Sequence, residues 1–245
     1  MKRVKKRIFA GTVCEQLVYA VSDRADVKKA KPRERFPDEE SRAAHRDAIA
    51  RKRFARLINA NHNPSSLYST LTFDDANELH YFSDAKRIRT MWRKVLQREC
   101  PDAKIIIVIG RGDNTNRIHF HMISGGIPAE AIRRLWKYGK VVDAKPLRRH
   151  NKYNGVDCGT DYTGLANYLF DHWTEEQGGH RYMATRNHVK PEAETPVEVK
   201  REYTEERAPA APRGYKLVEA KATPFGYIYY KYIKDPDVDF DSANE

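Results

Sequence analysis

Cysteine is scarce in this chain, and long apolar runs are absent. Only 3 of its 245 residues are cysteines, and Cys14, Cys100 and Cys158 stand far apart without a CxxC pair. This small, odd number of thiols argues against a disulfide framework or a cysteine-based zinc site and is typical of a reducing cytosol. No apolar run approaches the roughly 20 residues that cross a bilayer. We therefore expect a cytoplasmic protein without a membrane partner.

Acidic residues are also outnumbered, 34 against 45 basic ones, which gives a formal net charge of +11. The excess is concentrated in residues 1–60, with 17 Lys and Arg against 8 Asp and Glu. It falls to 18 against 14 in residues 61–185 and reverses to 10 against 12 in residues 186–245. A basic segment before a mildly basic region favours a polyanionic partner, most simply nucleic acid. A solvated, solubilising surface would have the same composition.

Hydrophobic periodicity predicts alternating strands and helices in the middle of the chain. The expected helices cover residues 38–60, 83–97, 128–136 and 161–173, and the expected strands cover residues 66–73, 104–110, 117–123 and 141–147. The turn-rich residues 111–116 predict a hairpin between the second and third strands. This order of elements indicates an α+β fold, an antiparallel sheet with flanking helices.

Composition divides the chain into three expected parts. Residues 1–60 form a basic N-terminal arm and helix, and residues 61–190 form the main domain. Residues 191–245 begin with a stretch rich in Pro, Glu and Ala, which is typical of a flexible linker, and end with a tyrosine-rich strand.

Two histidines stand one residue apart in the expected strand at residues 117–123. Because side chains alternate along a strand, His119 and His121 share one face, and the apolar residues between them line the other. Neutral imidazole is a common metal ligand, so the pair forms half of a divalent-cation site. The same pattern also fits a structural histidine pair.

Three short motifs occur in a particular order along the chain: TLTF at residues 70–73, HFH at residues 119–121 and LANY at residues 165–168. This order resembles the HUH endonucleases, specifically the rolling-circle replication initiators of small plasmids and phages. The resemblance covers about residues 55–190 and extends to RYMATRN at residues 181–187, which is similar to a stretch that follows the tyrosine helix in some initiators. It implies an antiparallel sheet of the RRM or palm-like kind.

The resemblance also implies a chemistry and a set of partners. A divalent metal, Mg²⁺ or Mn²⁺, would be held by His119 and His121 and would polarise a phosphodiester of origin DNA. Tyr168 would attack, leaving a 5′-phosphotyrosine and a free 3′-OH that primes synthesis, with strand transfer later. The expected partners are single-stranded or hairpin origin DNA and a host helicase and polymerase.

More than one tyrosine is a candidate nucleophile. Tyr168 matches the motif position after Leu-Ala, and Tyr162 lies six residues earlier on a different side of the helix. His172 stands one turn after Tyr168 and could contact it or the phosphate. The alternative for His172 is an exposed helix residue.

The chain departs from the family pattern at two positions. Relatives commonly carry an acidic metal ligand where this chain has Gly110, so Asp113 or water would complete the metal shell. Relatives also often carry a lysine where this chain has Asp171, so another cation would position the phosphate. The residues expected to contact DNA are Thr70, Thr72, Arg117, Arg148, Arg149 and Lys152.

Other functions fit the same motifs. A conjugative relaxase or a single-strand transposase also uses histidines and a tyrosine, although the TLTF motif fits initiators better. A DNA-binding relative that has lost cleavage is a third hypothesis, favoured by Gly110 and Asp171.

Overall fold

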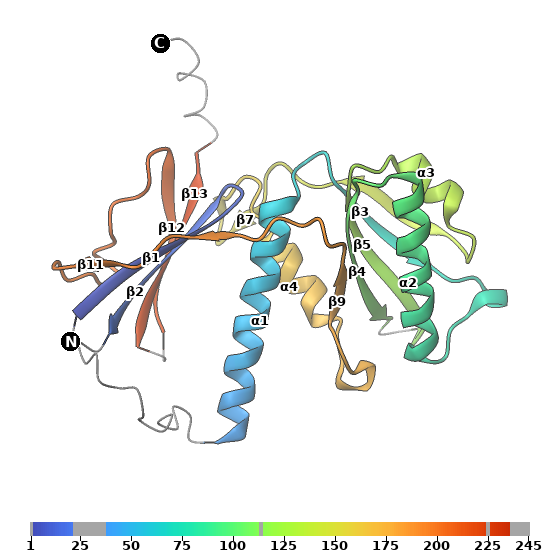
Figure 1. Ribbon diagram of the computed structural model, residues 1–245, viewed down its shortest axis with the longest axis horizontal. Helices are drawn as coiled ribbons and strands as arrows, with labels where there is room; N and C mark the ends of the chain where they lie inside the picture. Colours follow the sequence, from blue (N-terminus) through green and yellow to red (C-terminus); the bar gives the residue numbers. More distant parts are fainter. Residues whose placement is uncertain (1, 22–37, 113–114, 224–225, 236–245) are drawn as a thin grey trace, which may run out of the picture. The chain divides into compact units, whose positions relative to one another are not determined.

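The computed structural model describes residues 2–21, 38–112, 115–223 and 226–235 (Figure 1). The chain divides into two compact units, each made of segments that are distant in sequence. The histidine unit comprises Leu57–Arg149 and Tyr162–Lys190, and the terminal unit comprises Met1–Arg56, His150–Asp161 and Pro191–Glu245. The expected α+β class, with antiparallel sheets and flanking helices, is confirmed.

The histidine unit is built on a five-stranded antiparallel sheet of order β6-β3-β5-β4-β9. Its strands are β3 (Leu67–Thr72), β4 (Lys104–Arg111), β5 (Ile118–Gly125), β6 (Val141–Pro146) and β9 (Tyr182–Ala184). Its helices are α2 (Phe82–Glu99), α3 (Ala129–Leu135) and α4 (Thr163–Asp171), with short 3-10 turns η1 (Asp75–Asn77) and η2 (Glu175–Gln177). The expected β4–β5 hairpin is present.

One face of this sheet packs on α2 and α3. Ile118, Phe120 and Met122 of β5 enter this core, together with Trp92 of α2 and Ile132 of α3. The alternation of side chains along a strand turns His119 and His121 to the opposite face. The apolar half of the strand therefore fixes the direction in which its histidines point.

The terminal unit has a second antiparallel sheet, of order β10-β1-β2-β13-β12, with β11 also paired to β1. Its strands are β1 (Lys2–Ala10), β2 (Val13–Val21), β10 (Glu192–Ala193), β11 (Val197–Val199), β12 (Tyr215–Ala222) and β13 (Tyr227–Lys234). Helix α1 (Glu39–Asn61) belongs to it as far as Arg56.

The two ends of the chain therefore differ from the arm and linker that composition predicts. Strand β2 pairs with β1 on one side and with β13 on the other, so the first and last segments form one sheet. The tyrosine-rich strand at the C-terminal end is present, but it joins this second sheet rather than the sheet of the histidines.

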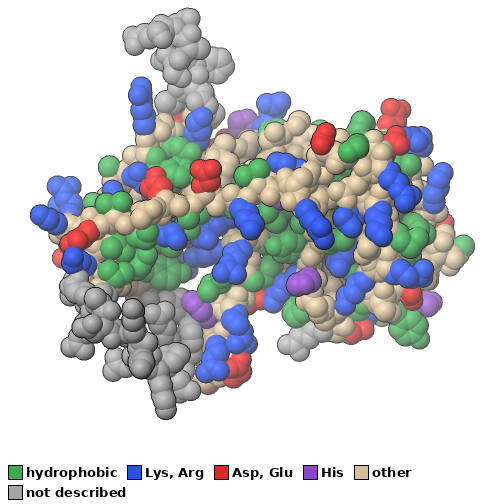
Figure 2. Space-filling model, in the orientation of Figure 1, with side chains coloured by type: hydrophobic (Ala, Val, Ile, Leu, Met, Phe, Trp, Pro, Cys, Tyr) green, Lys and Arg blue, Asp and Glu red, His purple; other side chains and the backbone are tan. Residues whose placement is uncertain are grey.

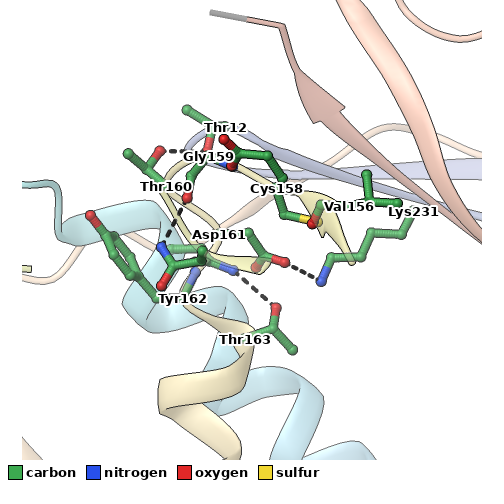
Figure 3. A network of polar contacts seen from close by, with 12 residues as sticks. Thr12, Val156, Cys158, Gly159, Thr160, Asp161, Tyr162, Thr163 and Lys231 are labelled. Carbon is green, nitrogen blue, oxygen red and sulfur yellow. Dashed lines mark hydrogen bonds and ion pairs between the residues drawn. The ribbon is translucent and has the colours of Figure 1, made fainter. Parts of the chain in front are cut away.

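A buried ion pair stabilises the terminal unit (Figure 3). The Lys231 ammonium of β13 donates to the Asp161 carboxylate, and both side chains are about 5% exposed. Nearby, the hydroxyls of Thr12 and Thr160 lie 2.9 Å apart. These contacts attach residues 158–161, which follow a small exposed hairpin of β7 (Lys152–Tyr153) and β8 (Val156–Asp157), to the sheet.

Figure 2 shows Lys and Arg side chains spread over the visible surface, with Asp and Glu between them. Within the described residues, no helix combines the length and the apolar composition that a bilayer span requires.

Candidate metal centre

Three histidines converge on the face of the sheet that turns away from α2 and α3. His119 and His121 come from β5, and His172 is the residue directly after α4. One ring nitrogen from each lies within 4.8 Å of the others, so the group could hold a metal ion. The ring centroids of His121 and His172 are 4.3 Å apart, and those of His119 and His121 are 4.6 Å apart.

The spacing of the two β5 histidines suits ligands of one cation. Their Nε2 atoms are 3.0 Å apart. Two nitrogens at that spacing, each about 2.1 Å from an ion, subtend an angle of about 90°, whereas tetrahedral ligands would stand about 3.4 Å apart. The separation of the two Nε2 atoms is therefore close to that of two ligands of one cation.

The outer nitrogens of the same imidazoles face oxygen atoms. Nδ1 of His119 lies 3.3 Å from the carbonyl oxygen of Arg117, and Nδ1 of His121 lies 2.7 Å from the hydroxyl of Tyr68. An oxygen partner at Nδ1 is the usual way in which a protein orients a histidine whose Nε2 binds metal.

Burial keeps one of these histidines neutral. His121 is 3% exposed, and burial lowers its pKa to about 3, with smaller contributions from His119 and His172. An imidazole with such a pKa has a lone pair available for a cation throughout the neutral range.

Gly110 of β4 is explained by the position of His119. The two residues are register partners across the β4–β5 pair. A Cβ atom at Gly110 would lie 2.6 Å from Nε2 of His119 and 3.1 Å from its Cε1. No side chain, acidic or other, fits there while His119 keeps this position. The third potential ligand is His172, from α4; Asp113 lies outside the described residues.

The two candidate tyrosines have opposite environments. Tyr168 is 51% exposed, and its ring centroid lies 4.7 Å from that of His172 and 5.6 Å from that of His121. Tyr162, the N-cap of α4, is 1% exposed, and its hydroxyl has no hydrogen-bond partner among the described residues. Burial raises the pKa of Tyr162 to about 12. The geometry thus favours Tyr168 as the tyrosine that a substrate could reach.

Of the residues expected to contact DNA, the two threonines lie beside the histidines. Thr70 and Thr72 are the register partners of His121 and His119, so they share their face of the sheet. The Thr72 hydroxyl donates to the carbonyl oxygen of Lys140 at 3.2 Å.

The basic residues of that group are distributed differently. Arg117 forms ion pairs with Asp75 at 2.9 Å and with Glu78 at 3.5 Å, which ties β5 to the segment after β3. Arg148 and Arg149 are exposed in the histidine unit, and Lys152 is exposed on β7 of the terminal unit. Asp171 is exposed at the end of α4.

Two residues of the cluster were not predicted as part of a metal site from the sequence. His172 follows Tyr168 by four residues, and this one-turn spacing is the signal that could have identified it as a ligand. Tyr68 precedes Thr70 by two residues, so strand periodicity already placed it on the same face.

The chain matches no protein-family model, no curated protein and no solved structure in the three comparisons with known proteins. The case for a function therefore depends on the residues of this cluster and on the order of the three motifs.

Proposed function

We propose that this protein is a metal-dependent DNA nuclease and strand transferase of the HUH type, in which Tyr168 is the nucleophile. The observation that supports it most strongly is the exposed Tyr168 ring beside three convergent histidines. In a histidine cluster with a purely structural role, an exposed tyrosine packed on the imidazole rings would have no function.

The proposed reaction is a transesterification at phosphorus. The Tyr168 oxygen forms a bond to the phosphorus atom while the bond from phosphorus to the 3′-oxygen breaks. The phenol proton passes to solvent, and the departing 3′-alkoxide gains a proton from water. One P–O ester replaces another, so the 5′-phosphotyrosine can later be attacked by a 3′-OH in strand transfer. A bound divalent cation would supply Lewis-acid polarisation of the phosphate.

The donor set bears on which cation would bind. Three imidazole nitrogens suit first-row transition ions better than Mg²⁺, which prefers oxygen ligands. Of the two expected ions, Mn²⁺ accepts nitrogen ligands more readily than Mg²⁺ does. We therefore propose that the site binds Mn²⁺ more tightly than Mg²⁺.

The proposed biological role is initiation of rolling-circle replication at single-stranded or hairpin origin DNA, with a host helicase and polymerase extending the 3′-OH. The order of the TLTF, HFH and LANY motifs supports it, as does the net charge of +11. A relaxase or a transposase would use the same chemistry on transfer-site or transposon-end DNA, so the preferred DNA sequence separates these roles.

The test is covalent capture of DNA. The full chain is incubated with Mn²⁺ and a pool of single-stranded oligonucleotides with randomised centres, and protein–DNA adducts are separated under denaturing conditions. We expect adducts that carry only the 3′-end label, a released fragment that a polymerase extends, and no adduct in EDTA. Sequencing the captured DNA gives the preferred site.

Tyr168→Phe should abolish the adduct. The matched control is Tyr153→Phe, because Tyr153 is also exposed, at 44%, but lies on β7 of the terminal unit. An adduct that persists in Tyr168→Phe would contradict the nucleophile assignment, and no adduct with any DNA in Mn²⁺ would contradict nuclease activity.

A further inference from the structure

Tyr68 contacts the potential metal ligand His121, on which the ring of the proposed nucleophile Tyr168 also packs. Tyr68 stands on β3, two residues before Thr70, which is the register partner of His121. Its ring stacks on the His121 ring, with centroids 5.8 Å apart and planes inclined by 19°. Its hydroxyl is 2.7 Å from His121 Nδ1. None of the three sequence motifs includes this residue.

His119 and His121 differ in what determines which ring nitrogen carries the hydrogen. Nδ1 of His119 faces a backbone carbonyl, which can only accept, so it carries the hydrogen and leaves Nε2 with a lone pair. Nδ1 of His121 faces a hydroxyl, which can accept or donate. If Tyr68 donated, a neutral His121 would carry its hydrogen on Nε2 and could not bind a cation there.

Binding of a cation at Nε2 of His121 would decide between these cases, because it requires the Nε2 lone pair and leaves the hydrogen of the neutral imidazole on Nδ1. The Thr70 hydroxyl donates to the Tyr68 hydroxyl at 3.5 Å. The Tyr168 ring also packs on His121, with centroids 5.6 Å apart, so both tyrosines contact the same imidazole. A hydroxyl has one hydrogen and two lone pairs. If the hydrogen goes to the Tyr168 oxygen, both lone pairs remain for the Thr70 hydroxyl and the His121 Nδ1–H. This arrangement leaves the His121 Nε2 lone pair for a cation, which would replace the present 3.0 Å contact between the Nε2 atoms of His119 and His121.

We propose that Tyr68 is a positioning residue: its hydroxyl accepts from His121 Nδ1–H and donates to the Tyr168 oxygen. One side chain thereby orients a metal ligand and locates the nucleophile's oxygen beside the metal centre. The first half concerns metal binding alone, and the second half rests on the proposed function of Tyr168.

The first half is tested with Tyr68→Phe, which keeps the ring stacked on His121 and removes only the hydroxyl. The Kd for Mn²⁺, measured by EPR titration without DNA, should rise about 10-fold or more, the usual effect of losing the outer partner of a ligating histidine. The control is Tyr138→Phe, because Tyr138 packs against Trp136 in the core on the opposite face, with ring centroids 5.2 Å apart.

Nitrogen-15 NMR of the histidine rings provides a readout that a merely structural role would not change. With Zn²⁺ as a diamagnetic probe, wild-type His121 should carry its hydrogen on Nδ1, and the signal of that hydrogen should shift in Tyr68→Phe. A wild-type His121 that binds Zn²⁺ through Nδ1 would overturn the assignment. So would a Tyr68→Phe variant whose Mn²⁺ Kd stays within twofold of wild type.

The second half is tested at saturating Mn²⁺, where single-turnover adduct formation should slow in Tyr68→Phe while DNA affinity is unchanged. An unchanged rate would overturn this half. If wild type itself forms no adduct but Tyr68→Phe still loses Mn²⁺ affinity, the proposed function fails and the role of Tyr68 toward His121 stands.

Discussion

Replacing Gly110 with alanine should remove His119 from the metal centre while leaving the fold intact. The added Cβ would lie 2.6 Å from Nε2 of His119, well below the ~3.4 Å of ordinary van der Waals contact, so one of the two must move by about 0.8 Å. The backbone of β4 pairs with β5 at Gly110 and with β9 as far as Val108, whereas the imidazole is the far end of a side chain. The His119 ring is therefore the group that moves.

A shift of that size exceeds what a metal site tolerates. Ligand distances in real sites vary by about 0.2 Å, so a displacement of about 0.8 Å takes Nε2 of His119 out of the shell. We expect the Kd for Mn²⁺ to rise at least as much as when an outer partner is lost, about 10- to 100-fold. Folding should change little, because alanine is favoured over glycine in a strand by roughly 0.5–1 kcal/mol, which offsets the cost of the displaced ring.

EPR or calorimetric titration with Mn²⁺ measures the effect, with Gly164→Ala as the control. Gly164 lies in α4, and a Cβ there would meet nothing within 4 Å. A double-mutant cycle makes the test sharper: in a His119→Ala background, Gly110→Ala should cost no further affinity. Wild-type affinity in Gly110→Ala, or full additivity in the cycle, would refute the reasoning.

Three more predictions follow from the same structure. His172→Ala should weaken Mn²⁺ binding at least 10-fold, whereas His150→Ala, an exposed histidine of the terminal unit, should leave the Kd unchanged; equal effects would count against His172 as a ligand. Burial, helped by His188 and Lys104, lowers the pKa of His62 to about 3, below the ~6.5 that is usual in the unfolded chain. The contribution of neutral His62 to the stability of the fold is therefore complete above pH ~6.5 and is lost as the pH falls. Lowering the pH from 7.5 to 5 should therefore cost about 2 kcal/mol through this residue, measured in EDTA as the difference in urea unfolding between wild type and His62→Gln; parallel pH profiles would contradict it. Lys231→Met should cost about 3–5 kcal/mol because it removes the cation that the buried Asp161 carboxylate contacts. The double variant with Asp161→Leu should recover much of that loss, and a double variant as unstable as the single one would show that the charge is not the cause.

Much of the histidine unit could be predicted from local sequence. Hydrophobic periodicity predicts its main strands and helices, and the turn-rich residues 111–116 are enough to predict the β4–β5 hairpin. The terminal unit was harder to predict. Strands β1 and β2 are two nine-residue segments joined by Gly11 and Thr12, which is a hairpin signal, yet Lys and Arg occupy five of the nine positions in β1. Nothing local indicates that β2 pairs with β13, more than 200 residues away.

By itself, the sequence determined that His119 and His121 share a face, because side-chain alternation is a local property of any strand. It also determined the antiparallel α+β class through the order of its periodic segments. Only the tertiary structure decided that His172 completes the cluster, that Tyr68 and Tyr168 both contact His121, and that Gly110 makes room for His119. These three relations join residues from different strands and helices, and their distances depend on how α4 and the neighbouring strands pack, which no local pattern encodes.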